Sequence, residues 1–200
     1  MACSCWQVAF YRKHLPHFNV DSIYNTIYDR ITKSYWEKKD QLSPETLDKV
    51  AWDSTGDGFQ TLPTGLQCTI GKNLSHFCRV NATRQLRKEL DHAECPCCNN
   101  PHETVYHVLQ CQHSGAQDIW SQAMMNLTQW MEKNKTAPHL TQCIISNLNA
   151  WNRGKEATKE APTTGRSQLQ CALQEQHEFG WYNFLNGRLS KRSFKYKQNS

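Results

Sequence analysis

The sequence predicts a mostly α protein, with little or no β-sheet and with a compact Cys/His cluster embedded among amphipathic helices. Two observations carry this prediction. Apolar residues recur at spacings of three and four along several stretches, which is the period of one face of an α-helix. Cysteines and histidines gather between residues 95 and 113, and convincing strand patterns are few. Seven each of Trp, Tyr and Phe supply apolar surface for a folded core.

Helices and turns are expected to alternate before the cluster. Isoleucines and tyrosines form one stripe over residues 21–39, which predicts an amphipathic helix. Ser43 as N-cap and Pro44 as first helical residue predict a short helix that runs through Leu47 and Val50. Residues 52–58 are turn-rich, and residues 62–70 are expected to be extended or irregular. Residues 79–90 are predicted to form a helix that leads into the cluster.

The turn-rich stretch also has carboxylates at the first and fifth positions of a potential calcium-binding loop, namely Asp53 and Asp57. Such a loop needs a bidentate glutamate eleven residues after Asp53, where this chain has Thr64. We therefore interpret the stretch as a turn capped by aspartates.

Two apolar stripes follow the cluster, over residues 119–131 and 140–151, and predict a helical hairpin joined by a short loop that contains Pro138. Residues 152–167 are rich in polar residues, Pro and Gly and are predicted to be a flexible linker. A last helix is expected from residue 168 to residue 186, ended by Gly187. The predicted organisation is an N-terminal helical segment (1–44), a module of the cluster and the hairpin (45–151), the linker (152–167), and a C-terminal helix with a basic tail (168–200).

The cluster has the spacing C-x2-C-x8-H-x3-C, formed by Cys95, Cys98, His107 and Cys111. Zinc prefers four tetrahedral nitrogen and sulfur ligands, and a two-residue gap lets one turn present two thiolates to one ion. His107 and Cys111 are four residues apart, which would place them on one face of a helix that starts at Thr104. The sequence therefore predicts a small CCHC zinc knuckle. Four protein ligands leave no vacant position, so the zinc is expected to be structural rather than catalytic.

Other assignments of these residues stay open. The cysteines could be small buried hydrophobic residues with no metal. Cys97, His102 and His113 are additional donors, and any of them could replace a predicted ligand. Cys97 is the strongest rival, although Pro96 between Cys95 and Cys97 disfavours that pair as a chelate.

The net charge of +5 is concentrated in the tail. After residue 186 the chain has five basic residues and no acidic one, so the other 18 of the 23 Lys and Arg residues balance the 18 Asp and Glu residues. A second basic stretch covers residues 72–89. In the tail, Phe194 and Tyr196 alternate with cations, a pattern suited to base stacking and phosphate neutralisation in RNA or single-stranded DNA. The residues predicted to bind nucleic acid are Arg79, Arg84, Arg87, Lys88, Arg188, Lys191, Arg192, Lys195 and Lys197. Alternatively, they are a solvated helix face and a solvated chain end.

The cysteine content indicates a reducing compartment. Ten cysteines would fit a disulfide framework in a secreted chain, but the N-terminus has no apolar run of signal-peptide length. No stretch approaches the roughly 20 apolar residues that span a bilayer. We therefore expect a nuclear or cytoplasmic protein that is neither secreted nor membrane-embedded.

The cluster resembles the zinc-binding region downstream of the polymerase in reverse transcriptases of non-LTR retrotransposons and related protist retroelements. Residues 47–63, 71–81 and 178–188 look like segments that flank this region in such proteins, and the likeness covers roughly residues 20 to 190. The resemblance implies a C-terminal remnant of a retroelement polyprotein. Polymerase activity would need catalytic aspartates for two metal ions, and this chain has no adjacent Asp-Asp pair.

Enzymatic activity is not expected, because the chain has neither a phosphate-binding glycine loop nor a Gly-x-Ser-x-Gly elbow. The predicted function is a non-catalytic zinc-binding module that binds RNA or single-stranded nucleic acid with low specificity. Two alternatives remain. One is a zinc-stabilised structural or protein-interaction domain, and the other is a degenerate retroelement relic without a selected function. A continuous basic face would favour nucleic acid, and an apolar groove would favour a protein partner.

Overall fold

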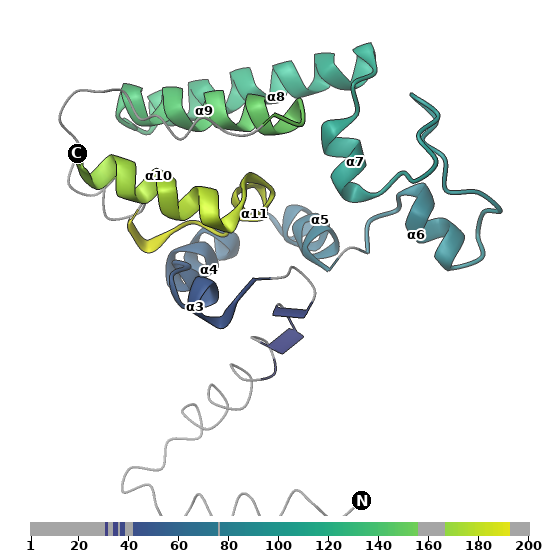
Figure 1. Ribbon diagram of the computed structural model, residues 1–200, viewed down its shortest axis with the longest axis horizontal. Helices are drawn as coiled ribbons and strands as arrows, with labels where there is room; N and C mark the ends of the chain where they lie inside the picture. The colour runs from purple at the N-terminus through teal and green to yellow at the C-terminus, as the bar shows by residue number, and fades with distance from the viewer. Residues whose placement is uncertain are drawn as a thin grey trace, which may run out of the picture. The chain divides into compact units, whose positions relative to one another are not determined.

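The computed structural model describes residues 42–75, 77–155 and 167–192, together with Ile31, Ser34, Tyr35, Glu37 and Lys38 (Figure 1). The chain divides into two compact units, Met1–Asp48 and Lys49–Ser200. Most of the helix predicted over residues 21–39 lies outside the described residues, as do most of the predicted linker and the last eight residues of the tail. The described part is mostly helical, which confirms the predicted fold class at this level.

The first unit ends with helix α3 (Pro44–Asp48). Its start is as predicted, because the Ser43 hydroxyl accepts a hydrogen bond from the Thr46 amide at 3.2 Å and Pro44 is the first helical residue. The helix is shorter than expected. Val50 lies beyond it, in the second unit, where it forms an isolated antiparallel β-bridge with Ser190.

The second unit begins with two helices that the sequence did not predict, α4 (Trp52–Gln60) and α5 (Thr64–Leu74). The turn prediction for residues 52–58 was wrong. Glycines in α4 weaken its helix propensity, but tertiary bonds hold its first turn: the Ala51 amide donates to the Leu189 carbonyl at 2.9 Å, and the Thr55 hydroxyl donates to the Gly187 carbonyl at 2.6 Å. Asp53 and Asp57 therefore lie on a helix and not in a calcium loop.

The extended or irregular structure expected for residues 62–70 is likewise corrected to helix α5. Leu66, Cys68 and Ile70 alternate as strand residues would, but Leu66, Ile70 and Leu74 are also spaced by four residues and share one helix face. The helix begins after Pro63, whose carbonyl accepts from the Leu66 and Gln67 amides at 2.9 and 3.0 Å. A short apolar run with both spacings is compatible with either structure, and here the helix forms.

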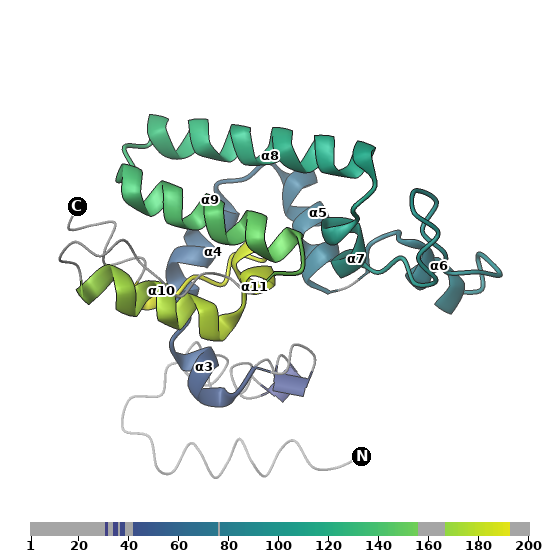
Figure 2. The ribbon, with the colours of Figure 1, turned by 45° about the horizontal axis from the view of Figure 1, so that its top comes forward.

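Two short helices flank the cysteine cluster, α6 (Asn81–Leu86) and α7 (Val105–Gln110). The helix predicted over residues 79–90 is thus present but shorter. It ends at Leu86 with Arg87 as C-cap, and the next residue, Lys88, has a positive φ of 60°, which takes the chain out of the helical path. In both views α7 lies between α6 and the hairpin that follows (Figure 1, Figure 2).

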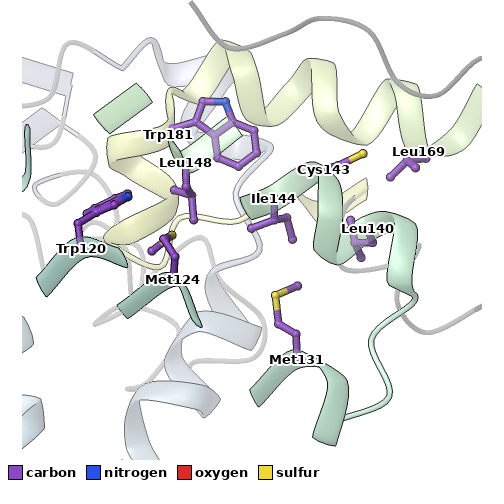
Figure 3. Close-up of a cluster of buried hydrophobic side chains, with 9 residues drawn as sticks. All are labelled: Trp120, Met124, Met131, Leu140, Cys143, Ile144, Leu148, Leu169 and Trp181. Atoms are coloured by element: carbon purple, nitrogen blue, oxygen red, sulfur yellow. The ribbon is translucent and has the colours of Figure 1, made fainter. Parts of the chain in front are cut away.

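The predicted hairpin is present as helices α8 (Ser114–Lys133) and α9 (Pro138–Asn152), which pack against each other (Figure 2). Pro138 occupies the first turn of α9, where its missing N–H costs nothing. Leu148 is fully buried between the side chains of α8 and Trp181, as Figure 3 shows. Among the described residues, nine buried side chains form this hydrophobic core: Trp120, Met124, Met131, Leu140, Cys143, Ile144, Leu148, Leu169 and Trp181.

The last predicted helix is two helices, α10 (Ser167–Phe179) and α11 (Trp181–Leu185). They are separated by Gly180, whose φ of 82° and ψ of 148° are accessible mainly to glycine. Gly187 follows α11 with a φ of 76°, as expected for a glycine that ends a helix. Among the helices described, none is both long enough and apolar enough to cross a membrane.

Candidate metal centre

The four predicted ligands lie together in the folded chain. The ligand atoms of Cys95, Cys98, His107 and Cys111 are all within 4.8 Å of one another. Cys95 and Cys98 come from the turn that precedes α7, His107 lies on α7, and Cys111 directly follows that helix. These four residues could hold a metal ion. We call them the CCHC cluster.

A tight turn positions the first two thiols. The Asn99 amide donates to the Cys95 carbonyl at 2.9 Å, and the Cys95 amide donates to the Asn100 carbonyl at 2.8 Å. Asn99 has a φ of 57°, a left-handed conformation that asparagine tolerates better than most residues. The backbone therefore reverses around Cys98 and directs both thiols to one side, as a two-residue gap between zinc ligands requires.

Helix α7 positions the other two ligands, with one difference from the expectation. Thr104 is the N-cap, as predicted, and its hydroxyl accepts from the His107 amide at 3.0 Å. Cys111 is not on the helix face. It is the C-cap residue, with extended φ and ψ of −60° and 124°. The chain leaves the helix at Cys111 and still brings its thiol into the cluster, because one helical turn separates it from His107.

One separation within the cluster lies close to that expected around a small ion. Cys98 Sγ lies 3.3 Å from His107 Nε2. Tetrahedral zinc, with bonds of about 2.3 Å to sulfur and about 2.0 Å to nitrogen, places its ligand atoms roughly 3.5–3.8 Å apart. Cys95 and Cys111 are buried, at 2 % and 4 % exposure, while Cys98 is exposed. An ion held here would have two buried ligands and one side close to solvent.

The buried thiols differ in acidity. Burial raises the pKa of Cys95, but hydrogen bonds from the backbone of Cys97 and Cys98 and from the His107 side chain outweigh it and lower this pKa to about 7. Burial, with the neighbouring sulfurs of Cys98 and Cys95, raises the pKa of Cys111 to about 11, although a hydrogen bond with the His113 backbone lowers it. Since the thiolate is the metal-binding form, Cys95 is prepared to bind, whereas a metal ion must displace the Cys111 proton.

The three rival donors lie outside the cluster. Cys97 and His102 are exposed and do not belong to the group of ligand atoms that lie within 4.8 Å of one another. The His113 side chain has another role, because its Nδ1 accepts from the Gly115 amide at 3.3 Å at the start of α8. The structure therefore groups the same four residues that the sequence spacing selects.

Hydrogen bonds between residues far apart in sequence attach the cluster to the helices on both sides. The Glu103 carboxylate and carbonyl accept from the Asn81 and Ala82 amides at 2.7 and 3.2 Å, which joins α6 to the chain before α7. On the other side, Gln110 donates to the Trp151 carbonyl at 2.6 Å, which joins α7 to α9. The spacing of the ligands gives no sign of these contacts, because their partners are 22 and 41 residues apart.

The predicted nucleic-acid-binding residues occupy different environments. Arg79, Arg87 and Lys88 are exposed beside α6. Arg84 is half-buried, and Arg84 and Arg87 lie 3.8 and 3.9 Å from the Glu89 carboxylate. Such partly exposed ion pairs are weak and leave both cations able to bind other anions.

One of the predicted C-terminal cations, Arg188, requires a correction. Arg188 is 2 % exposed and donates to the Asn183 side chain, so it packs in the fold and does not present a surface charge. Lys191 and Arg192 are exposed, and Arg192 lies 2.9 Å from Glu175. Lys195 and Lys197 lie outside the described residues.

Three aromatic rings beside the cluster were missed by the sequence analysis. The ring centroid of Tyr106 on α7 is 5.3 Å from that of Trp151 on α9 and 5.5 Å from that of Tyr182 on α11. Trp151 and Tyr182 are nearly parallel, with 27° between their planes. No local spacing could have found this group, because its members come from three separate helices.

Comparison with known proteins identifies no relative: no protein family, no curated protein and no solved structure matches the chain.

Proposed function

We propose that the chain is a non-catalytic zinc-binding module that binds RNA or single-stranded DNA with low sequence specificity. The observation that carries this proposal is the gathering of Cys95, Cys98, His107 and Cys111 within 4.8 Å of one another. Three thiols and one imidazole form a donor set that structural zinc sites use.

A structural role for the zinc follows from the number of ligands. Four protein donors fill a tetrahedral zinc, so water and substrate have no position on the ion. The ion instead connects two parts of the chain, the turn that contains Cys95 and Cys98 and the helix that contains His107. It thereby holds the 91–104 loop, and α6 bonded to that loop, against the hairpin α8–α9.

Binding to nucleic acid is supported by the exposed cations on either side of α6. Arg79, Arg87 and Lys88 are exposed on α6 and its flanks, and α6 is bonded directly to the chain around the cluster. Contacts of this kind with phosphates do not read sequence and weaken as salt rises. The resemblance to the zinc-binding region of retroelement reverse transcriptases favours the same function, and we propose a retroelement origin for the module.

A protein-interaction domain is the second candidate, and one observation favours it. Several large apolar side chains are strongly exposed, among them Leu86 at 84 % and Ile119 at 74 %. Contiguous exposed apolar surface is a feature of protein interfaces. Leu86, however, lies on α6 directly beside the exposed cations. Its exposure therefore does not distinguish a protein-binding function from a nucleic-acid-binding function.

The first experiment is elemental analysis of the purified full chain together with two variants. We expect one zinc per chain in the parent, loss of zinc in Cys98→Ser, and retention in Cys171→Ser, a matched control at an exposed cysteine on α10. A parent without zinc would overturn the proposal. The zinc-loaded protein is then titrated with labelled RNA at 50 and 200 mM salt. We expect weaker binding at the higher salt, and a protein that does not bind at 50 mM would contradict the nucleic-acid part.

A further inference from the structure

A shallow depression lies next to the CCHC cluster, between α6, the start of α7, and α11. Its volume is about 430 Å³, within the range of about 300–1,000 Å³ that small-molecule sites occupy. Its lining comes from Val80, Ala82, Thr83, Leu86, Thr104, Val105, Tyr106 and Tyr182. We call it the Tyr106 depression. Its walls are mostly apolar, with two threonine hydroxyls and two tyrosine rings.

The aromatic side of the depression is held by packing. Tyr106 is 46 % exposed, yet its ring meets the Trp151 ring edge-on, at an interplanar angle of 80°. Trp151 in turn stacks on Tyr182 and packs against Trp120, with centroids 6.2 Å apart in both pairs. An exposed ring held by half-buried neighbours loses little side-chain entropy when a ligand stacks on it.

Three cations flank, in sequence, the α6 residues that line the depression. Arg79 and Arg87 are four residues on either side of Thr83, which lines the depression, and Lys88 follows directly. All three cations are exposed. The Arg87 guanidinium lies 4.7 Å above the Phe77 ring, which keeps it beside α6. The one carboxylate near these cations in the 79–90 stretch, that of Glu89, contacts Arg84 and Arg87 only at 3.8 and 3.9 Å.

We propose that the Tyr106 depression binds one unpaired base of a single-stranded nucleic acid, with the base stacked on Tyr106 and the flanking phosphates contacted by Arg79, Arg87 and Lys88. This proposal rests on the proposed function and adds the site and a preference for single strands. In a duplex the faces of the bases are already stacked on each other, whereas an unpaired base can turn out onto an aromatic ring. An apolar groove without nearby cations would suit a protein side chain equally well. The exposed cations next to the lining residues of α6 favour a polyanion.

The experiment uses the zinc-loaded full chain, with fluorescence anisotropy of a labelled single-stranded RNA of mixed sequence and of the same RNA annealed to its complement. We expect tighter binding to the single strand. Tyr106→Ala is expected to weaken single-strand binding by about 5- to 150-fold, which is the range for loss of one stacked base. Tyr106→Phe keeps the ring and is expected to bind as the parent does. Trp130→Ala, at an exposed aromatic on α8, controls for loss of any exposed ring.

A second pair of variants does not depend on how Tyr106→Ala folds. Leu86→Glu places a carboxylate in the lining at a side chain that is already 84 % exposed. Gln85→Glu makes the same change of charge at the adjacent exposed residue, outside the lining. We expect Leu86→Glu to weaken single-strand binding at least fivefold more than Gln85→Glu. Zinc content is measured for each variant, so that loss of the metal is not mistaken for loss of the base site.

The outcomes separate this site from the general function. If the parent binds RNA but Tyr106→Ala and Leu86→Glu bind as tightly as their controls, the base site is overturned and the nucleic-acid function stands. If the parent binds neither the single strand nor the duplex, both are overturned. Equal affinity of the parent for the single strand and the duplex would also overturn the base site, because stacking requires an unpaired base.

Discussion

The side chain of Asn152, at the end of α9, donates a hydrogen bond from Nδ2 to the backbone carbonyl of Leu109 on α7, at 2.6 Å. Two glutamines, at the end of α7 and just after it, donate in return to carbonyls of α9. Gln110 donates to the Trp151 carbonyl at 2.6 Å, and Gln112 donates to the Asn152 carbonyl at 2.8 Å. The last carbonyls of a helix have no partner within it. These side-chain amides donate to carbonyls at the C-terminal ends of α7 and α9. They also fix the helix that contains His107 to the hydrophobic core.

Asn152→Ala is expected to destabilise the fold. Asn152 is 2 % exposed, so its loss leaves the Leu109 carbonyl unsatisfied at a part-buried position. We expect the free energy of unfolding to fall by about 1–3 kcal/mol. Urea denaturation measures the change. Asn126→Ala removes an exposed amide from α8 and is expected to change stability by less than about 0.5 kcal/mol. Equal effects of the two substitutions would contradict the role of this contact.

Removal of zinc is expected to loosen the cluster and leave the core folded. None of the four ligands belongs to the hydrophobic core cluster among the described residues, which is built from α8, α9, α10 and α11. Metal-binding free energy in such sites stabilises the segment that holds the ion. After treatment with a chelator we expect faster hydrogen exchange over residues 91–111, with protection kept in α8 and α9. Added zinc is expected to restore the slow exchange. Simultaneous loss of protection in both regions would show that the metal stabilises the whole unit.

The grouping of the four cluster residues and the hairpin could be predicted from sequence because both depend on short spacings. The two-residue gap between Cys95 and Cys98 and the four-residue step from His107 to Cys111 are set by one turn and one helix. The apolar stripes of α8 and α9 repeat over enough turns to define the period. The cluster lies within residues 95–111, and the two hairpin helices are 20 and 15 residues long.

Other features could not be predicted, because residues far apart in sequence determine them. Residues 52–60 form α4 although they include Gly56, since α4 is bonded to the segment around Gly187. The sequence predicts that Arg188 belongs to a basic tail, yet the fold buries this side chain against Asn183. The group of rings around Tyr106 needs α7, α9 and α11 to meet. Tertiary contacts override local pattern at all three places.

The thiol of Cys143 is expected to resist alkylation. Cys143 lies in the core on α9, at 8 % exposure, and burial raises its pKa. With iodoacetamide at pH 8, followed by peptide mass spectrometry, Cys143 is expected to react far more slowly than the exposed Cys171 on α10. Reaction at similar rates would show that α9 opens readily.

The same shift in pKa fixes the direction of a pH effect on stability. The folded state holds the Cys143 proton more tightly than the unfolded state does. The contribution of the protonated Cys143 thiol to stability is therefore complete below the pKa of an unfolded cysteine, about 8.5. This contribution is lost as the pH rises through the pKa of Cys143 in the folded state. The difference in unfolding free energy between the parent and Cys143→Ala is expected to shrink between pH 8 and pH 10. A difference that grows over this interval would contradict the sign.

Two glycine-to-alanine substitutions are expected to have opposite effects. A methyl group would meet no atom within 4 Å at either Gly180 or Gly56, so space does not distinguish them. Gly180 has a φ of 82°, between α10 and α11, and alanine there is expected to cost about 1–3 kcal/mol of backbone strain. Gly56 lies in the middle of α4, and alanine there is expected to stabilise the fold by about 0.5–1 kcal/mol. Thermal unfolding of both variants measures the two changes. If Gly180→Ala melted as high as the parent, α10 and α11 could form one continuous helix, and the break would not be imposed by the rest of the fold.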